Sequence, residues 1–194
     1  DRNQIEMADI LKAILRIMYR APESTESDGL NTELIACHEA GHALIAQLLE
    51  PGSVDLVSVH RHHGNIDGIT ALHQQEDYFQ SKKQMENRVL CLLAGKAATE
   101  LCYGMTDTGA GSDLRRAFRI VDRMVGEYCS FGFDTCKYTD MQSETLLARR
   151  EQQAASEMDR YYAQVKQMLA ENWRKLEILI LRLQKEKILL GDQI

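Results

Sequence analysis

Apolar residues recur every three or four positions along most of the chain, a spacing that predicts amphipathic helices. The first such stretch runs from Ile5 to Arg20, and a polar segment without periodicity follows it over residues 22–29. Segments rich in Pro, Ser and Gly between periodic stretches are typical of linkers. We therefore expect two parts, an N-terminal helix with its linker over residues 1–29 and a main domain over residues 30–194.

Five further helices are predicted within the main domain. Their limits follow from capping residues at their starts and from Gly, Asn or Pro at their ends. Ser81-x-x-Gln84, for example, is a capping box. The predicted ranges are Asn31–Leu49, Ser81–Gly104, Ser112–Gly132, Ser143–Glu171 and Trp173–Leu189. The last two helices form a long C-terminal pair.

One region between the first two of these helices has a different pattern. Residues 54–60 alternate between apolar and polar, as expected for a half-buried strand, and Ile66 to Leu72 forms a second, weaker strand that contains Gly68. A polar turn over residues 60–65 joins the two strands into a β-hairpin. The sequence therefore predicts a mainly α fold with one small β-hairpin or sheet.

Composition excludes several classes of function. The 194-residue chain has a net charge of −6, whereas binding to nucleic acid requires clustered Lys and Arg. No apolar run approaches the ~18 residues of a membrane-spanning helix, so we expect no membrane span. The five cysteines include no C-x-x-C pair, and we expect reduced, buried thiols in an intracellular protein. The chain begins without Met inside an amphipathic pattern, and we expect it to be part of a longer protein.

The strongest chemical motif is the H-E-x-x-H pattern of residues 38–42, which lies in the first helix of the main domain. Residues four apart share one face of a helix, so His38 and His42 can bind one metal ion together. Glu39 lies next to the first ligand, where its carboxylate can take a proton from water. The flanking residues are apolar, and burial of two imidazoles and a carboxylate among them would be costly without a metal or partners.

A catalytic zinc site needs a third protein ligand and keeps one position open for water. In one known pattern a histidine lies six residues after the second histidine, but that position holds Leu48. The alternatives are downstream acids: Glu100, Asp107, Asp113, Asp122 and Glu127. The last two lie among charged neighbours, as on a solvated helix face. Position in the predicted elements favours Asp113, at a glycine-rich loop that leads into a helix, and leaves Glu100 open.

Four other histidines surround the predicted hairpin and raise the question of a second metal site. They are His60, His62, His63 and His73. No carboxylate pattern accompanies them, and they lie in a loop and at strand ends. We therefore expect solvated loop histidines.

Three motifs occur in a familiar order. They are His-Glu-Ala-Gly-His at residues 38–42, the segment Leu93–Gly104 and the segment Thr108–Leu114. In order and spacing they resemble the peptidase domain of the FtsH-type ATP-dependent zinc metalloproteases, and the likeness runs from about Leu30 to the C-terminus. Thr99 stands where that family has the first of two adjacent glutamates, and the segment after Phe131 is shorter.

The resemblance implies a helical, zincin-like peptidase domain with one zinc ion per chain. The zinc ligands would be His38, His42 and Asp113, and Glu39 would be the catalytic base. Glu100 then becomes a candidate for an outer residue that orients the ligands. These roles come from the family pattern, whereas spacing alone leaves Asp113 and Glu100 as alternatives.

The resemblance also implies polypeptide substrates and a larger assembly. An extended substrate would add as a strand to residues Ile69, Thr70, Ala71 and Leu72. Family members carry an AAA+ ATPase module, which uses ATP and Mg²⁺, before the peptidase and work as membrane-anchored homo-hexamers. This chain would then lie on the cytoplasmic side of a membrane and degrade unfolded or membrane-associated proteins. The alternatives are a non-catalytic zinc-bearing scaffold of the same fold and a metal-free helical interaction module.

Overall fold

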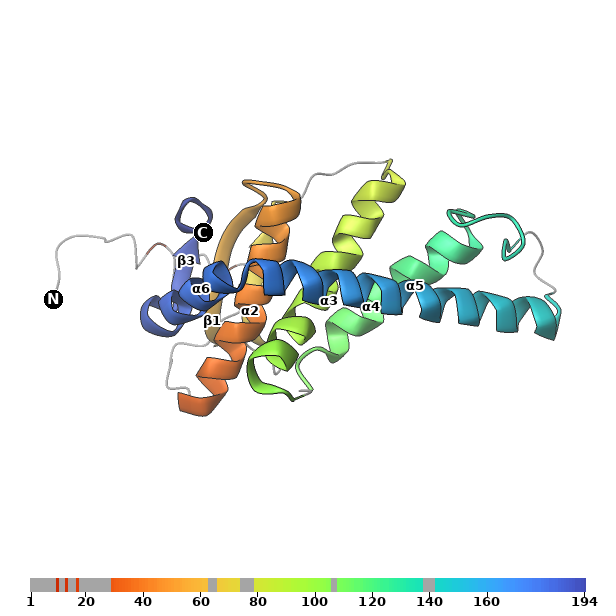
Figure 1. Ribbon diagram of the computed structural model, residues 1–194. Helices are drawn as coiled ribbons and strands as arrows, with labels where there is room; N and C mark the ends of the chain where they lie inside the picture. The colour runs from red at the N-terminus through yellow and green to blue at the C-terminus, as the bar shows by residue number, and fades with distance from the viewer. Residues whose placement is uncertain are drawn as a thin grey trace, which may run out of the picture.

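The computed structural model describes residues 29–62, 66–73, 79–105, 108–137 and 142–194, together with the helical residues Ile10, Ala13 and Ile17. Figure 1 shows the order of the elements along the chain. They are α2 (Gly29–Leu49), β1 (Val54–His62), β2 (Ile66–Leu72), α3 (Lys82–Tyr103), α4 (Gly111–Gly126), α5 (Glu144–Glu171), α6 (Trp173–Glu186), β3 (Ile188–Leu190) and a short 3-10 helix (Gly191–Gln193). Most of the predicted N-terminal helix and linker lies outside the described residues, so the division at residue 29 stays a prediction.

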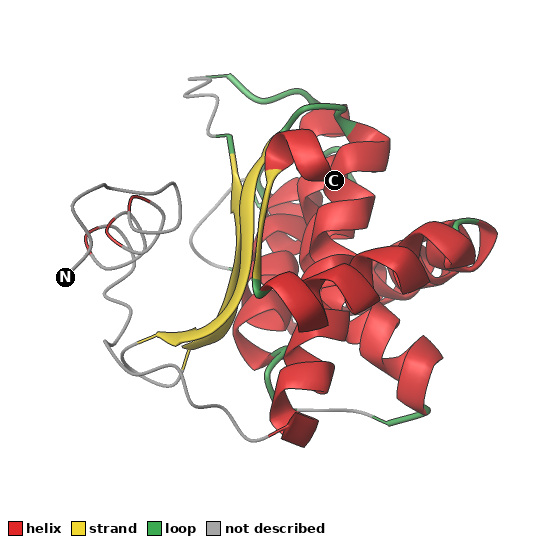
Figure 2. Cartoon of the chain, turned by 90° about the vertical axis from the view of Figure 1, so that its left-hand side faces the viewer, coloured by secondary structure: helices red, strands yellow, loops and turns green. Residues whose placement is uncertain are grey.

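The three strands form one antiparallel sheet in the order β2-β1-β3. In the centre, Val57 of β1 pairs with Thr70 of β2 on one side and with Leu189 of β3 on the other. Figure 2 shows the helical layer on one side of this sheet. Antiparallel sheets commonly pack one face against a core in this way. Because β1 is the central strand of the three, β2 lies at an edge of the described sheet.

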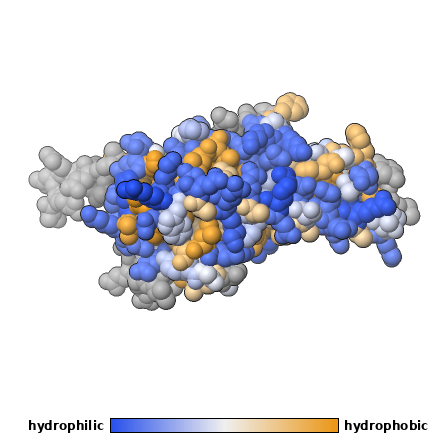
Figure 3. All heavy atoms as spheres, viewed as in Figure 1, coloured by the Kyte–Doolittle hydropathy of each residue, from blue (hydrophilic) through white to orange (hydrophobic). Residues whose placement is uncertain are grey.

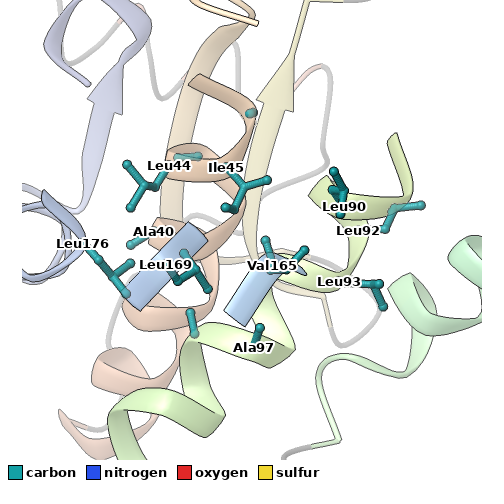
Figure 4. Close-up of a cluster of buried hydrophobic side chains, with 14 of the residues drawn as sticks. Ala40, Leu44, Ile45, Leu90, Leu92, Leu93, Ala97, Val165, Leu169 and Leu176 are labelled. Atoms are coloured by element: carbon teal, nitrogen blue, oxygen red, sulfur yellow. The ribbon is translucent and has the colours of Figure 1, made fainter. Parts of the chain in front are cut away.

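Helix α2 lies at the centre of the core. It packs against α3, α5 and α6 as well as against β1 and β2. Figure 4 shows apolar side chains of α2, α3, α5 and α6 in this cluster, and Ile45, Leu93, Leu169 and Leu176 are almost completely buried. Burial of one such side chain contributes about 1.5–3 kcal/mol. The helix that carries the H-E-x-x-H motif is thus held from several sides.

Several predicted boundaries are confirmed. Ser81 caps α3 through a capping box with Gln84, and Gly104 ends that helix in the left-handed conformation, with φ of 65°. At the start of α5, the hydroxyl of Ser143 accepts a hydrogen bond from the Leu146 N–H. The mainly α fold, with a small sheet and a C-terminal helix pair, is confirmed.

Two helices begin or end away from the expected residues. α2 begins at Gly29, before the expected cap Asn31. α4 begins one residue before Ser112, so that Ala110 and not Ser112 is its N-cap, and it ends at Gly126 instead of near Gly132. The chain turns after Gly126, and Gly132 belongs to that turn, with φ of 125°. Such terminal residues depend on local packing that periodicity does not report.

The C-terminal helix is shorter than predicted. It ends at Glu186, because Lys187 adopts the left-handed conformation, with φ of 66°, and its N–H bonds to the carbonyl of Leu183. The next three residues, Ile188–Leu190, form β3 beside β1. A short apolar run fits a buried helix end and a strand equally well. Pairing with the free edge of β1 decides between them.

The structure joins Cys129 and Cys136 in a disulfide, so the expectation of reduced thiols is wrong for these two residues. The segment after α4 turns back on itself, and the Lys137 N–H bonds to the carbonyl of Gly126. This turn brings the two Cα atoms to 5.5 Å, which the spacing along the sequence does not reveal. Three cysteines form no disulfide: Cys37, Cys91 and Cys102.

The outer surface is mixed in character. Figure 3 shows a face dominated by hydrophilic residues, with apolar residues scattered among them. Scattered exposed apolar side chains are normal on a protein surface. Within the described part of the chain, no helix combines the length and the apolar character needed to cross a lipid bilayer.

Candidate metal centre

Two histidines of α2 form the first part of the candidate centre. His38 and His42 lie one turn apart, and their Nε2 atoms are 3.0 Å apart. Only 11% and 13% of their side-chain surfaces are exposed. The helix therefore aims two imidazole nitrogens at one largely enclosed point.

Asp113, in the first turn of α4, supplies a carboxylate at the same point. Its Oδ2 lies 3.5 Å from Nε2 of His38 and 3.3 Å from Nε2 of His42. α4 packs against α3, which in turn packs against α2, so α3 connects the two ligand-bearing helices. Within the described residues, these three side chains are the group that could hold a metal ion together. The helix N-terminus also favours the ionised form of Asp113.

The donor atoms fit a zinc ion. Neighbouring ligands of a tetrahedral zinc are about 3.3–3.6 Å apart when each lies about 2.0–2.2 Å from the metal. The three pairs of atoms here are separated by 3.0, 3.3 and 3.5 Å. Nδ1 of His42 lies 2.6 Å from the carbonyl oxygen of Cys91. Because a carbonyl only accepts, Nδ1 carries the hydrogen, and Nε2 presents its lone pair to the site.

Two glycines allow α2 and α3 to approach closely. A Cβ atom at Gly41 would lie 2.6 Å from the carbonyl oxygen of Ala94 and 2.6 Å from Cβ of Ala98. A Cβ atom at Gly95 would lie 2.4 Å from Nε2 of His38. The imidazole of His38 therefore occupies the space that a side chain at Gly95 would need. Its position depends on glycine in α3.

Glu39 is the next residue in α2 and contacts β2. The hydroxyl of Thr70 donates a hydrogen bond of 2.7 Å to Oε2 of Glu39 and lies 3.2 Å from its backbone carbonyl oxygen. Gly68 has φ of 84°, and a Cβ atom there would lie 2.7 Å from Oε1. Only 5% of Glu39 is exposed. A buried carboxylate beside the ligand cluster is placed to accept a proton.

The electrostatics give the two carboxyl groups different properties. Burial raises the pKa of Glu39, although the charges of His42 and His38 and the Thr70 hydrogen bond oppose the increase. Burial would also raise the pKa of Asp113, but hydrogen bonds with the two histidines outweigh it and hold the pKa well below its usual range. Burial would lower the pKa of His42, and the bond with Asp113 raises it instead. Asp113 is thus held ionised, as a cation ligand must be, whereas Glu39 has increased proton affinity.

Glu100 does not reach the histidines. Its carboxylate accepts hydrogen bonds of 2.9 Å from both Lys96 and Lys166 and a further one from the hydroxyl of Tyr162. The Tyr162 bond, followed by those of the two lysines, lowers the pKa of Glu100 to about 2. These contacts join α3 to α5. The role of Glu100 in orienting the metal ligands stays a prediction.

Two of the other acids that spacing left open, Asp122 and Glu127, do not join the cluster. Asp122 lies 3.3 Å from Arg150, and Glu127 lies 3.0 Å from Arg123. Both acids face solvent, as the charged neighbourhood in the sequence predicted. Asp107 lies outside the described residues. Among the described acids, Asp113 is the candidate that the fold brings to the histidines.

The histidines of the hairpin contribute no second cluster within the described part of the chain. His73 is largely exposed and lies 3.6 Å from Asp55, which is also exposed. His63 lies outside the described residues.

Comparison with known sequences identifies the family. The sequence model of peptidase family M41 matches residues 26–194. The chain belongs to peptidase family M41. The resemblance to FtsH-type peptidase domains is thereby confirmed.

Relatives of this M41 domain carry consistent names. The chain is 32% identical, over 91% of its length, to ATP-dependent zinc metalloprotease FtsH 1 of Thermoanaerobacter sp. (strain X514). It is 31% identical over its whole length to FtsH 2 of Symbiobacterium thermophilum, and 29% identical to FtsH of Bacillus subtilis (strain 168). It covers 30%, 35% and 33% of these relatives. The chain thus spans about a third of the length of the curated relatives that it matches.

Several supports of the M41 site were not recognised from the sequence. Glycine inside a strand or helix pattern often marks a close backbone approach. Gly68 and Gly95 therefore indicated that other groups pack closely against β2 and α3. Thr70 was expected only as part of a substrate strand, and its bond to Glu39 depends on how β2 lies over α2. Cys91 acts through its carbonyl oxygen, and no side-chain pattern predicts such a contact.

Proposed function

We propose that this domain is a zinc-dependent endopeptidase. The observation that carries the proposal is the convergence of Nε2 of His38, Nε2 of His42 and Oδ2 of Asp113 within 3.0–3.5 Å of one another. Two imidazoles with a carboxylate are a common ligand set of catalytic zinc. The names of the relatives, which are zinc metalloproteases, agree with this proposal.

The chemistry follows from the position of each group. When bound, a zinc ion polarises the scissile carbonyl and lowers the pKa of water toward about 7. Glu39 accepts the proton of the attacking water and returns it to the nitrogen of the leaving amine. Its increased proton affinity, caused by burial, favours transfer of the proton from water to Glu39. His42 is kept in the metal-binding tautomer by the carbonyl of Cys91.

We further propose that the substrate is an extended polypeptide that adds to β2. Residues 69–72 lie in a strand at the edge of the described sheet, and the side chain of Thr70 in that strand reaches Glu39. Strand addition uses backbone hydrogen bonds and so accepts many sequences. A binding strand that contacts the catalytic base would place the scissile bond next to that base.

The full activity would require parts beyond this domain. The relatives are named as ATP-dependent, and the chain covers about a third of their length. We propose that an AAA+ module, using ATP and Mg²⁺, delivers unfolded or membrane-associated proteins to the peptidase. The complete protein would work as a homo-hexamer, with this domain on the cytoplasmic side of a membrane.

The test compares the complete natural protein with its Glu39→Gln variant, using an unfolded protein substrate and ATP. Metal content is measured by elemental analysis in parallel. We expect one zinc per chain in both proteins and a loss of cleavage of about 10²-fold or more in Glu39→Gln. Glu33→Gln is a matched control, because Glu33 is an exposed glutamate of the same helix.

Two outcomes would contradict the proposal. Cleavage retained by Glu39→Gln would remove Glu39 from the role of base. Stoichiometric zinc without any turnover in the assembled wild-type protein would favour the non-catalytic scaffold instead. Loss of zinc in Asp113→Asn, with His38 and His42 intact, would support the third ligand.

A further inference from the structure

Strand β2 touches the catalytic carboxylate in two places. The hydroxyl of Thr70 lies 2.7 Å from Oε2 of Glu39, and Gly68 lies beside Oε1. Residues two apart in a strand point to the same face. The face of β2 that covers α2 therefore carries a donor for one carboxylate oxygen and an open space for the other.

The Thr70 hydroxyl has one hydrogen and two acceptors within reach. These are Oε2 of Glu39 at 2.7 Å and the backbone oxygen of the same residue at 3.2 Å. The shorter distance assigns the hydrogen to the carboxylate. A hydroxyl bonded to one oxygen fixes the rotation of the carboxylate plane about its last side-chain bond, which otherwise turns freely.

Gly68 provides the second restraint. A Cβ atom there would lie 2.7 Å from Oε1 and 2.8 Å from Cγ of Glu39, as well as 2.7 Å from Cγ2 of Ile35. Glycine is thus needed for β2 to lie this close to α2. The same close approach brings the Thr70 hydroxyl into hydrogen-bond range.

We propose that Thr70 is a positioning residue for the catalytic base, and that its hydroxyl holds the Glu39 carboxylate in the orientation that accepts the proton of water. This inference rests on the proposed peptidase function. It goes beyond that function by giving β2 a second task, so that one strand both aligns the substrate and orients the base. Thr70 touches neither the reacting water nor the metal ligands in this scheme and acts only through Glu39.

The experiment uses Thr70→Val and Thr70→Ser in the complete protein, with kcat, KM and zinc content measured for each. Valine keeps the shape of threonine and removes the hydroxyl, whereas serine keeps the hydroxyl. We expect Thr70→Val to lower kcat by about tenfold with KM changed less than about twofold, and Thr70→Ser to restore kcat to within about threefold of wild type. Zinc content should stay at one per chain in both variants. If Thr70→Val fails to fold, Thr70→Ala takes its place.

A matched control removes a hydroxyl elsewhere. Thr135 is buried and donates a hydrogen bond of 3.3 Å to the carbonyl of Val125. Val125 lies twelve residues after Asp113 in α4, about 18 Å along the helix. Thr135→Val should therefore leave kcat unchanged while making the same chemical change.

A readout apart from activity follows the carboxylate itself. In structures of the metal-free variants, Glu39 should leave its place or adopt several orientations in Thr70→Val and keep the wild-type orientation in Thr70→Ser. An unchanged Glu39 in Thr70→Val, or a wild-type kcat, would overturn the inference. Equal losses of kcat in Thr70→Val and Thr70→Ser would also overturn it, because packing and not the hydroxyl would then be responsible.

Parallel assays of wild type and Glu39→Gln separate this inference from the proposed function. An inactive wild type or an active Glu39→Gln would refute the function and the inference together. When wild type is active and Glu39→Gln is not, a wild-type kcat in Thr70→Val refutes the positioning role of Thr70 alone.

Discussion

Replacement of Gly95 by alanine should weaken metal binding without unfolding the domain. A Cβ atom at this position would lie 2.4 Å from Nε2 of His38, whereas ordinary contacts begin at 3.4 Å. The imidazole must therefore move by about 1 Å, the difference between these distances. Disturbing the groups that hold a metal ligand in place typically reduces the affinity for the metal by about 10–100-fold, or about 1.4–2.8 kcal/mol. We expect a decrease of this size in zinc affinity when the imidazole of His38 moves.

The effect of Gly95→Ala on folding should be smaller. Alanine is more favourable than glycine inside a helix by about 1 kcal/mol, and the clashing group is a side chain that can rotate. By contrast, a Cβ atom at Gly41 would meet the backbone of α3 at Ala94, so Gly41→Ala should separate the two helices and lower the melting temperature. Gly111→Ala is the control for stability, because a Cβ atom at Gly111 would lie 3.6 Å from Arg115, an ordinary contact distance.

The assay titrates the metal-free proteins with zinc against a competing chelator and follows unfolding by circular dichroism. Gly95→Ala should show the reduced zinc affinity together with a melting temperature within a few degrees of wild type. Cleavage should fall by about 10²-fold, because a displacement of 1 Å at a catalytic site has effects of this size. Wild-type zinc affinity in Gly95→Ala would refute the reasoning, since His38 could not then be held against α3 as described.

Two further predictions concern ionisable groups away from the metal ligands. The pKa of Glu100 is lowered to about 2 from its ordinary 4.5, so its ion pairs stabilise the fold fully above about pH 5 and progressively less as the pH falls toward 2. Because its carboxylate is partly exposed, we expect Glu100→Gln to lower the free energy of unfolding by only about 1–2 kcal/mol at pH 7 and by almost nothing near pH 2, as measured by denaturant unfolding. An equal decrease at both pH values would contradict this account. Burial raises the pKa of the Cys91 thiol to about 12, so only about one molecule in 10⁴ is a thiolate at pH 8. Iodoacetamide should therefore modify Cys102, whose pKa is lowered by its hydrogen bond with Cys37, well before Cys91, and mass spectrometry that finds the reverse order would refute the burial argument.

Most helices, together with the caps of α3 and the N-cap of α5, were predictable because they depend on local sequence. The capping box of Ser81 and the left-handed Gly104 both appear where the pattern places them. The end of α6 was not predictable, because residues 188–190 become a strand only by pairing with β1, far away in the sequence. The disulfide of Cys129 with Cys136 likewise depends on a turn that no periodicity reports.

For the candidate site, the sequence by itself determined the pair of histidines. Residues four apart on a helix share one face whatever surrounds the helix, so His38 and His42 needed only a helical pattern. Tertiary structure decided the rest. Packing of α4 on α3 brings Asp113 within 3.5 Å of both histidines and leaves Glu100 with Lys96 and Lys166. Spacing along a chain cannot distinguish such acids, because which distant segments meet is set by the burial of entire helix faces and not by the ligands themselves.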